Sequence, residues 1–186
     1  LGAIDRRIDP KRETININAT KIRTNPYLYR DYVPDIVYKD LITKIVFVGA
    51  MSTGKSTLTE ALSKKFNTVF ASEYGRDYWT ENEVDRRIGF EDFDIIARIH
   101  IEREDKMVLQ ANKYLFVDTN AITTYMYSLD YHGKAPEYLT RMALENAQRY
   151  DLFFLCDDDI PYDDTWDRSG PQKRSVFHKQ IIADLE

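Results

Sequence analysis

KIVFVGAMSTGKST occupies residues 44–57 and joins an apolar run to a glycine-rich loop. The loop fits the pattern G-x-x-x-x-G-K-[ST], and the apolar run that precedes it is typical of a buried strand. Glycines at positions 49 and 54 allow backbone angles that other residues avoid, so successive N–H groups can turn inward around phosphate oxygens. The stretch therefore predicts a nucleoside triphosphate site between a strand and a helix. Its predicted nucleotide-binding residues are Gly49, Ser52, Thr53, Gly54, Lys55, Ser56 and Thr57.

Two side chains of this loop have predicted chemical roles. Lys55 is expected to reach the β- and γ-phosphates and to act in catalysis, and the Ser56 hydroxyl to ligand Mg²⁺. ATP and Mg²⁺ are therefore the expected cofactors.

The composition excludes several classes of protein. The chain has 186 residues, 43% of them hydrophobic, which is enough for one core with a small appendage. A net charge of −5 argues against nucleic-acid binding through a broad basic surface. No apolar run approaches the ~20 residues that span a membrane, and no signal peptide opens the chain. The single cysteine, Cys156, is expected to be a buried structural thiol in the cytoplasm. The sequence also allows the protein to form an oligomer.

The order of apolar and amphipathic segments predicts an α/β fold of the P-loop NTPase kinase type, with a parallel sheet between two helical layers. Residues 1–42 carry three prolines and predict loops with at most one short helix. The predicted second domain covers residues 43–186. Its expected strands are 44–48, 68–71, 114–117 and 152–156, and its expected helices are 54–65, 93–112, 121–129 and 136–149, with a last helix near the chain end. In the first of these helices, Leu58, Ala61 and Leu62 are expected to form the buried face.

Four predicted strands are one fewer than the five that such a kinase sheet usually has. We expect the last strand and helix to lie beyond this chain. An exposed sheet edge or an apolar helix face would then need a partner.

Ligands of parallel sheets gather at the carboxyl ends of the strands. The second predicted strand is followed by Glu73 and Arg76, which are predicted to orient an acceptor hydroxyl and to bind a substrate or phosphate oxygen. Tyr74, Tyr78 and Trp79 offer aromatic faces to a flat ring. The alternative is a surface ion pair beside a buried aromatic core.

The third predicted strand ends at Asp118. An acidic residue at this place is typical of the Walker B arrangement, in which the carboxylate holds Mg²⁺ together with the loop serine. Asp118 is accordingly a predicted metal, catalytic and substrate-binding residue. It is also suited to cap the following helix.

A charged, turn-rich stretch, residues 157–174, follows the fourth predicted strand. Its arginines Arg168 and Arg174 are predicted to form part of a lid that brings positive charge to the transferring phosphate. The alternative is a solvated charged loop. The three histidines show no metal-ligand spacing.

Taken together, Gly49–Thr57, Glu73-Tyr74-Gly75-Arg76, Phe116-Val117-Asp118-Thr119 and Asp167-Arg168-Ser169 resemble the ribosylnicotinamide kinase domain of NadR-type bifunctional proteins. The resemblance runs from about Thr43 to the chain end. It implies ATP-dependent phosphorylation of nicotinamide riboside to nicotinamide mononucleotide, with Glu73 or Asp118 orienting the riboside hydroxyl.

The N-terminal segment is similar to the closing motif of the adenylyltransferase domain that precedes the kinase in those proteins. The similar residues are Ile17-Asn18-Ala19-Thr20-Lys21-Ile22-Arg23, then Asn25-Pro26-Tyr27 and Tyr32-Val33-Pro34. The resemblance implies that residues 1–42 are the tail of such a domain, and that the parent protein also transfers adenylyl groups.

Two residues depart from the family pattern: Asn18 stands where the closing motif usually has a serine, and Ser72 bears on the acceptor. The family often has a tryptophan before the Glu-Tyr-Gly-Arg block, placed to stack on the nicotinamide ring, whereas this chain has Ser72. A kinase of another nucleoside and a non-catalytic sensor of ATP or a pyridine nucleotide are therefore kept as alternatives.

Overall fold

A computed structural model describes residues 9–82, 88–163 and 171–185. The chain divides into two compact units, Leu1–Leu41 and Ile42–Glu186. Among the described residues, every helix is too short or too polar to cross a lipid bilayer. The candidate site lies wholly in the second unit.

The first unit consists of short helices held by local contacts. These are α1 (Ala19–Thr24), the 3-10 helix η1 (Arg30–Tyr32) and α2 (Asp35–Leu41). Asn18 caps α1, because its side-chain oxygen accepts a hydrogen bond of 2.8 Å from the Lys21 N–H. The Tyr27 hydroxyl donates to the Leu41 carbonyl at 3.0 Å, and the Tyr27 ring packs edge-on against Tyr38.

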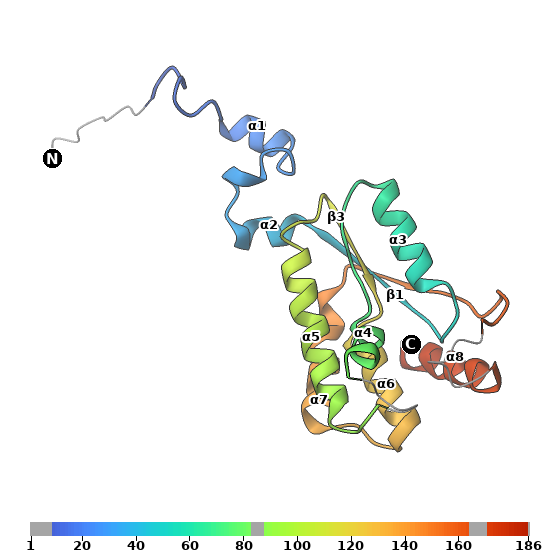
Figure 1. Cartoon of the computed structure of the whole chain (residues 1–186). Helices are drawn as coiled ribbons and strands as arrows, with labels where there is room; N and C mark the ends of the chain where they lie inside the picture. The colour runs from blue at the N-terminus through green and yellow to red at the C-terminus, as the bar shows by residue number, and fades with distance from the viewer. Residues whose placement is uncertain (1–8, 83–87, 164–170, 186) are drawn as a thin grey trace. The chain divides into compact units, whose positions relative to one another are not determined.

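The second unit has a four-stranded parallel sheet in the order β2-β3-β1-β4. Figure 1 shows α3 on one side of β1 and β3, and α5 and α7 on the other. This α/β arrangement with a phosphate-binding loop confirms the predicted fold class. The elements are β1 (Thr43–Val48), α3 (Lys55–Lys65), β2 (Phe70–Ala71), α4 (Tyr74–Glu81), α5 (Asp92–Met107), β3 (Tyr114–Asp118), α6 (Ala121–His132), α7 (Glu137–Asn146), η2 (Ala147–Arg149), β4 (Leu152–Leu155) and α8 (Pro171–Leu185).

Alternate residues of β1 lie on the same face of the sheet, as the pleat of a strand requires. Ile45, Phe47 and Phe116 form a cluster with Leu62 of α3. A separate, larger cluster joins α4, α5, α6 and α7 around Phe93 and Leu139. The sheet thus holds the phosphate loop against α3, while the helical cluster forms the other half of the unit.

The buried face of α3 differs from the prediction. Leu58 and Ala61 are exposed, and the buried residues are Lys55, Thr59 and Ser63. Thr59 and Ser63 are small, and their hydroxyls donate to helix carbonyls, so they can be buried where the helix lies against the sheet. Of the predicted apolar face, only Leu62 packs against the core.

Several other boundaries also differ. β2 is only two residues long, because the Thr68 hydroxyl bonds to the Tyr114 carbonyl at 2.6 Å in place of backbone pairing. α5 ends at Met107 instead of residue 112. Tyr74 begins a helix, α4, that the sequence did not predict.

β4 forms one edge of the sheet. Its four apolar side chains are between 37% and 50% exposed. Cys156, directly after β4, is only partly buried, which corrects the prediction of a buried thiol. Its burial still raises the pKa of the thiol.

Candidate active site

The loop between β1 and α3 is shaped by backbone conformations that glycine permits. Gly49 has φ +147°, and a Cβ there would lie 2.6 Å from the Cys156 carbonyl oxygen. Gly54, at φ +79°, starts α3, and Ser52 also has a positive φ of 61°. The loop therefore turns tightly into a helix N-terminus, where N–H groups and the helix dipole favour an anion.

Lys55 lies over this loop and is only 7% exposed. Its ammonium group donates to the Ala50 carbonyl at 2.7 Å, and the Thr53 hydroxyl donates to the same oxygen at 2.8 Å. These bonds keep the lysine and threonine on the cavity side of the loop, where both line the cavity.

Asp118 lies at the end of β3 and is 2% exposed. Burial raises the pKa of Asp118, although the neighbouring Ser56 side chain and the charges of Lys55 and Arg76 favour the ionised form. Within the part of the chain that the structure describes, Asp118 Oδ1 is buried without a hydrogen-bond partner. A carboxylate with an unused oxygen beside a serine hydroxyl fits the oxygen ligands that Mg²⁺ prefers.

A single cavity of about 330 Å³ joins the phosphate loop to the helical cluster. One end is the loop from Met51 to Thr57. The other end is walled by α4, α5 and α6. The residues lining this second end include Glu73, Tyr74, Arg76, Trp79, Phe93, Ile96, His100, Thr124, Tyr127 and Tyr131. Polar groups thus enter an otherwise aromatic pocket, as in small-molecule sites.

Glu73 is an acidic residue of this wall. Glu73 immediately precedes α4 and lines the cavity together with Arg76, one turn further on. Desolvation raises the pKa of the Tyr127 phenol, and the nearby Glu73 carboxylate raises it further. The cavity therefore brings a carboxylate and tyrosines from α6 close together.

The predicted aromatic residues of α4 are divided between cavity and core. Tyr74 and Trp79 line the cavity, whereas Tyr78 does not line it and packs in the helical cluster. The Arg103 guanidinium lies 4.4 Å from the centre of the Tyr74 ring, and the Tyr74 hydroxyl donates to Glu81 at 3.1 Å. Much of the Tyr74 side chain is thus engaged by protein groups.

The sequence analysis missed Phe93, His100, Thr124, Tyr127 and Tyr131. A signal for the last three was present, because they are spaced three and four residues apart on a helix that begins just after Asp118. This spacing puts them on one face of α6. Phe93, Ile96 and His100 have the same spacing on α5, but α5 does not directly follow a strand, so its position in the sequence does not point to the site.

Arg174 was predicted to belong to a lid, and its side chain contacts a backbone carbonyl of the phosphate loop. It is 6% exposed and donates to the Ser52 carbonyl at 3.1 Å and to the Ile160 carbonyl at 2.8 Å. The Asp163 N–H donates to the Ser52 hydroxyl at 2.8 Å. α8 and residues 160–163 are therefore joined directly to the loop. Arg168 lies outside the described residues.

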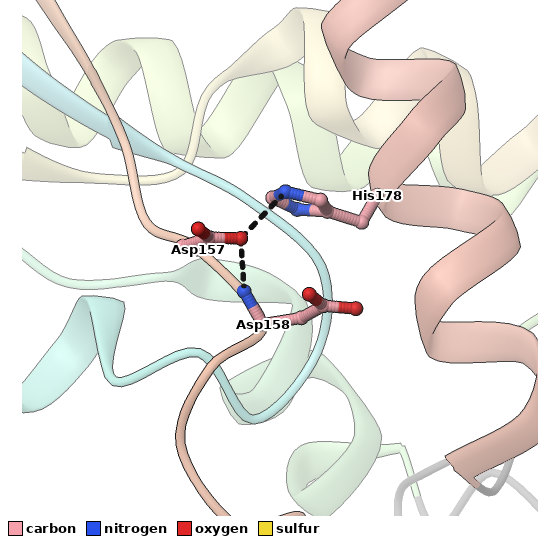
Figure 2. A group of neighbouring side chains, drawn as sticks. All are labelled: Asp157, Asp158 and His178. Carbon is pink, nitrogen blue, oxygen red and sulfur yellow. Dashed lines mark hydrogen bonds and ion pairs between the residues drawn. The ribbon is translucent and has the colours of Figure 1, made fainter.

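A contact between His178 and Asp157 also joins α8 to the segment after β4. His178 Nε2 lies 3.2 Å from Asp157 Oδ1, which accepts a bond of 2.8 Å from the Asp158 N–H (Figure 2). These three side chains have ligand-type atoms within 4.8 Å of one another. The Asp157 side chain is 71% exposed, so we assign the group the role of an anchor for α8.

A family model described as "AAA domain" matches residues 44–186. The chain belongs to the AAA domain family. The matched residues include the whole phosphate loop, β3 with Asp118 and the cavity-lining helices.

The chain is also homologous to proteins named "Trifunctional NAD biosynthesis/regulator protein NadR". It is 36% identical over 190 residues to the one from Escherichia coli and 35% identical to the one from Salmonella typhimurium. All of this chain is covered, with 46% of each relative, so the chain spans about half the length of these curated relatives.

Two solved structures of NadR share the fold. The NadR protein in complex with NR superposes with a TM-score of 0.68 at 23% identity, covering 94% of this chain and 50% of that one. The NadR protein in complex with NAD and AMP-PNP gives 0.70 at 24% identity, covering 94% and 49%.

Proposed function

We propose that this protein transfers the γ-phosphoryl group of ATP to the 5′-hydroxyl of nicotinamide riboside, forming nicotinamide mononucleotide and ADP in NAD biosynthesis. The observation that carries the proposal is the single cavity with a phosphate loop at one end and a carboxylate among aromatic rings at the other. Homology to NadR and a solved NadR complex with NR support this choice of acceptor.

The loop end is suited to bind the triphosphate. Backbone N–H groups between Gly49 and Thr57 would bind phosphate oxygens, and Lys55 would exchange the Ala50 carbonyl for a phosphate. Mg²⁺ would be held by Ser56 and Asp118, and when bound it neutralises phosphate charge. The solved NadR complex with AMP-PNP supports the choice of an adenine nucleotide.

The acceptor end is suited to bind a riboside with a cationic ring. Trp79, Tyr127 and Tyr131 would supply the ring contacts that the family tryptophan, Ser72 in this chain, does not. Stacking on a pyridinium is a cation–π contact worth about 1–2 kcal/mol.

We assign to Glu73 the role of orienting the acceptor hydroxyl and accepting its proton. Glu73 lines the cavity, whereas Asp118 is almost fully buried and lies near Ser56. As the riboside oxygen bonds to phosphorus and the bond to ADP breaks, the hydroxyl proton would pass to the Glu73 carboxylate. Arg76 would stabilise charge on the transferring group. Positioning and electrostatics would supply most of the acceleration.

We further propose that residues 1–42 are the tail of an adenylyltransferase-like domain of a larger protein. The similarity of residues 17–34 to the closing motif of such domains supports this. The single cysteine is consistent with a cytoplasmic location.

One residue favours a different acceptor. Ser72 replaces the family tryptophan, and Arg103 donates to its hydroxyl at 3.4 Å, so the stacking partner of the ring differs. A kinase of another nucleoside is therefore the second candidate.

The test is an ATP-dependent phosphorylation assay of nicotinamide riboside against a panel of nucleosides, with Lys55→Ala as the blank. We expect turnover of the riboside, and a fall in kcat of at least about 10³-fold in the blank, because a charge stabilising the transferring phosphate is lost. Turnover of another nucleoside alone would replace the acceptor. ATP binding without any turnover would favour a nucleotide sensor.

A further inference from the structure

We propose that His100 is a positioning residue that fixes the turn Asp118–Asn120 through its hydrogen bond to the Thr119 carbonyl. The inference rests on the proposed function, in which this turn carries the Mg²⁺ and phosphate chemistry. His100 belongs to α5, eighteen residues before Asp118 in the chain, and the sequence gives no hint of the pairing.

The turn has a backbone conformation that needs support. Thr119 has φ +63°, in the left-handed region that β-branched residues rarely occupy. Its N–H donates to the Phe47 carbonyl of β1 at 3.1 Å. The residue is 5% exposed, so its polar groups depend on protein partners.

His100 is the partner of the Thr119 carbonyl. Its Nε2 lies 3.2 Å from that oxygen, and the ring is buried, with 2% of the residue exposed. Because a carbonyl only accepts hydrogen bonds, this contact requires the proton on Nε2. The Thr119 residue is then bonded to β1 on its amide side and to α5 on its carbonyl side.

A buried polar network adjoins His100 at the same nitrogen that contacts Thr119. Glu104, one helical turn further along α5, has Oε1 3.4 Å from His100 Nε2 and accepts a 2.7 Å bond from the Tyr150 hydroxyl. Arg149 lies 3.6 Å from the second oxygen of Glu104 and donates to Asp105 at 2.7 Å. The imidazole is thus packed against groups that are themselves fixed, which satisfies the condition for a rigid supporting residue.

The turn connects the two ends of the cavity. On one side Asp118 lies near Ser56 of the phosphate loop, whose side chain favours the ionised carboxylate and lowers its pKa. On the other side Asn120 caps α6, because its Oδ1 accepts bonds from the Thr123 N–H at 2.9 Å and from the Thr123 hydroxyl at 3.0 Å. A shift at Thr119 would therefore move both Asp118 and the start of α6, which carries Tyr127 and Tyr131.

The test compares His100→Leu, which removes the donor, with His100→Gln, whose amide nitrogen can replace Nε2. Asn146→Leu is the matched control. Asn146 is also buried and also donates to a backbone carbonyl, that of Met142 at 2.7 Å, but it lies on α7 and does not line the cavity. Two quantities are measured at a temperature where all variants are folded: amide hydrogen exchange across residues 117–124, and the steady-state kcat with the Kd for ATP.

We expect His100→Leu to speed exchange in this segment and to lower kcat by about 10- to 100-fold, with the Kd for ATP changed less than about 3-fold. His100→Gln should recover most of both effects, and Asn146→Leu should change neither. Unchanged exchange and kcat in His100→Leu would overturn the inference, as would equal losses in His100→Leu and Asn146→Leu. If the wild-type protein does not phosphorylate the riboside, the proposed function is wrong, and the exchange data alone still decide whether His100 fixes the turn.

Discussion

The two ends of the cavity are built in different ways. The phosphate end is a continuous loop, residues 49–57, whose shape depends on backbone angles at Gly49 and Gly54. The acceptor end is a wall of side chains from three helices that are separated by up to about sixty residues in the chain. The first end therefore has a local sequence pattern, whereas the second depends on how the helices pack.

This difference implies a division of function. The phosphate loop would bind the nucleotide in much the same way whatever the acceptor, since backbone N–H groups do not depend on side-chain identity. The helical wall would determine which hydroxyl is phosphorylated. Substitutions in the wall should then affect acceptor use and leave nucleotide binding intact, and the following predictions test that separation.

Among substitutions in the helical wall, the largest effect is expected from Glu73→Gln. Loss of the carboxylate should lower kcat by about 10²- to 10³-fold, because general-base assistance and acceptor orientation are lost together. The Kd for ATP should stay within about 3-fold of wild type. Steady-state kinetics measures kcat, and calorimetric titration measures the Kd for ATP.

Asp77→Asn is the matched control, since Asp77 is an acidic residue of α4 that pairs with Arg103 and does not line the cavity. A kcat for Glu73→Gln close to that of the control would break the assignment of the acceptor hydroxyl to Glu73.

The second prediction concerns the polar network behind the wall. Burial raises the pKa of Glu104 from 4.5 to about 7, despite the Tyr150 hydrogen bond and the charges of Arg149 and Lys44. The folded state therefore binds the Glu104 proton more tightly than the unfolded state. The resulting stability is fully present below about pH 4.5 and is lost as the pH rises through 7.

Glu104→Gln should remove this dependence of the unfolding free energy on pH. Relative to the variant, the wild-type protein should lose up to about 3 kcal/mol of unfolding free energy between pH 4.5 and 8. The opposite contribution of His100, whose pKa burial lowers to about 4, is present in both proteins and cancels to first order. Urea unfolding at several pH values measures the difference. Glu102→Gln on the exposed face of α5 is the control and should show a flat difference. A flat difference for Glu104→Gln would contradict the prediction.

The smallest effect is expected from Tyr131→Leu. Removing one aromatic face from the acceptor end should raise the KM for nicotinamide riboside by about 5- to 20-fold, since a cation–π contact is worth about 1–2 kcal/mol. The KM for ATP should be unchanged. Tyr125→Leu, the same change on the same helix, is the control, because Tyr125 packs against the helical cluster without lining the cavity. Equal changes in both variants would show that the wall does not contact the ring through Tyr131.

The sequence predicted those parts of the molecule whose signals are local. The phosphate loop, the four strands and the position of Asp118 at the end of β3 follow from short patterns of apolar and glycine residues. The buried face of α3 could not be predicted in this way. Thr59 and Ser63 can be buried there because their hydroxyls donate hydrogen bonds to carbonyls of their own helix. Hydrophobic periodicity does not detect such residues.

The helical wall shows the same limit more clearly. Glu73, Arg76 and Trp79 were predicted because they follow a strand directly, whereas Phe93 and His100 enter the cavity only through the packing of α5 against α4 and α6. Tyr78 was predicted as a ring contact from its place in the same stretch, but on α4 it packs in the helical cluster and does not line the cavity. Sequence position identified the residues near strand ends but not those brought in by tertiary contacts.

The most direct test of the two-ended cavity is an experimental structure with AMP-PNP, Mg²⁺ and nicotinamide riboside bound together. The account predicts the triphosphate on residues 49–57, the riboside ring among Trp79, Tyr127 and Tyr131, and the 5′-hydroxyl within hydrogen-bond distance of Glu73. A riboside bound outside the wall of α4, α5 and α6, or a 5′-hydroxyl directed away from the γ-phosphate, would contradict it.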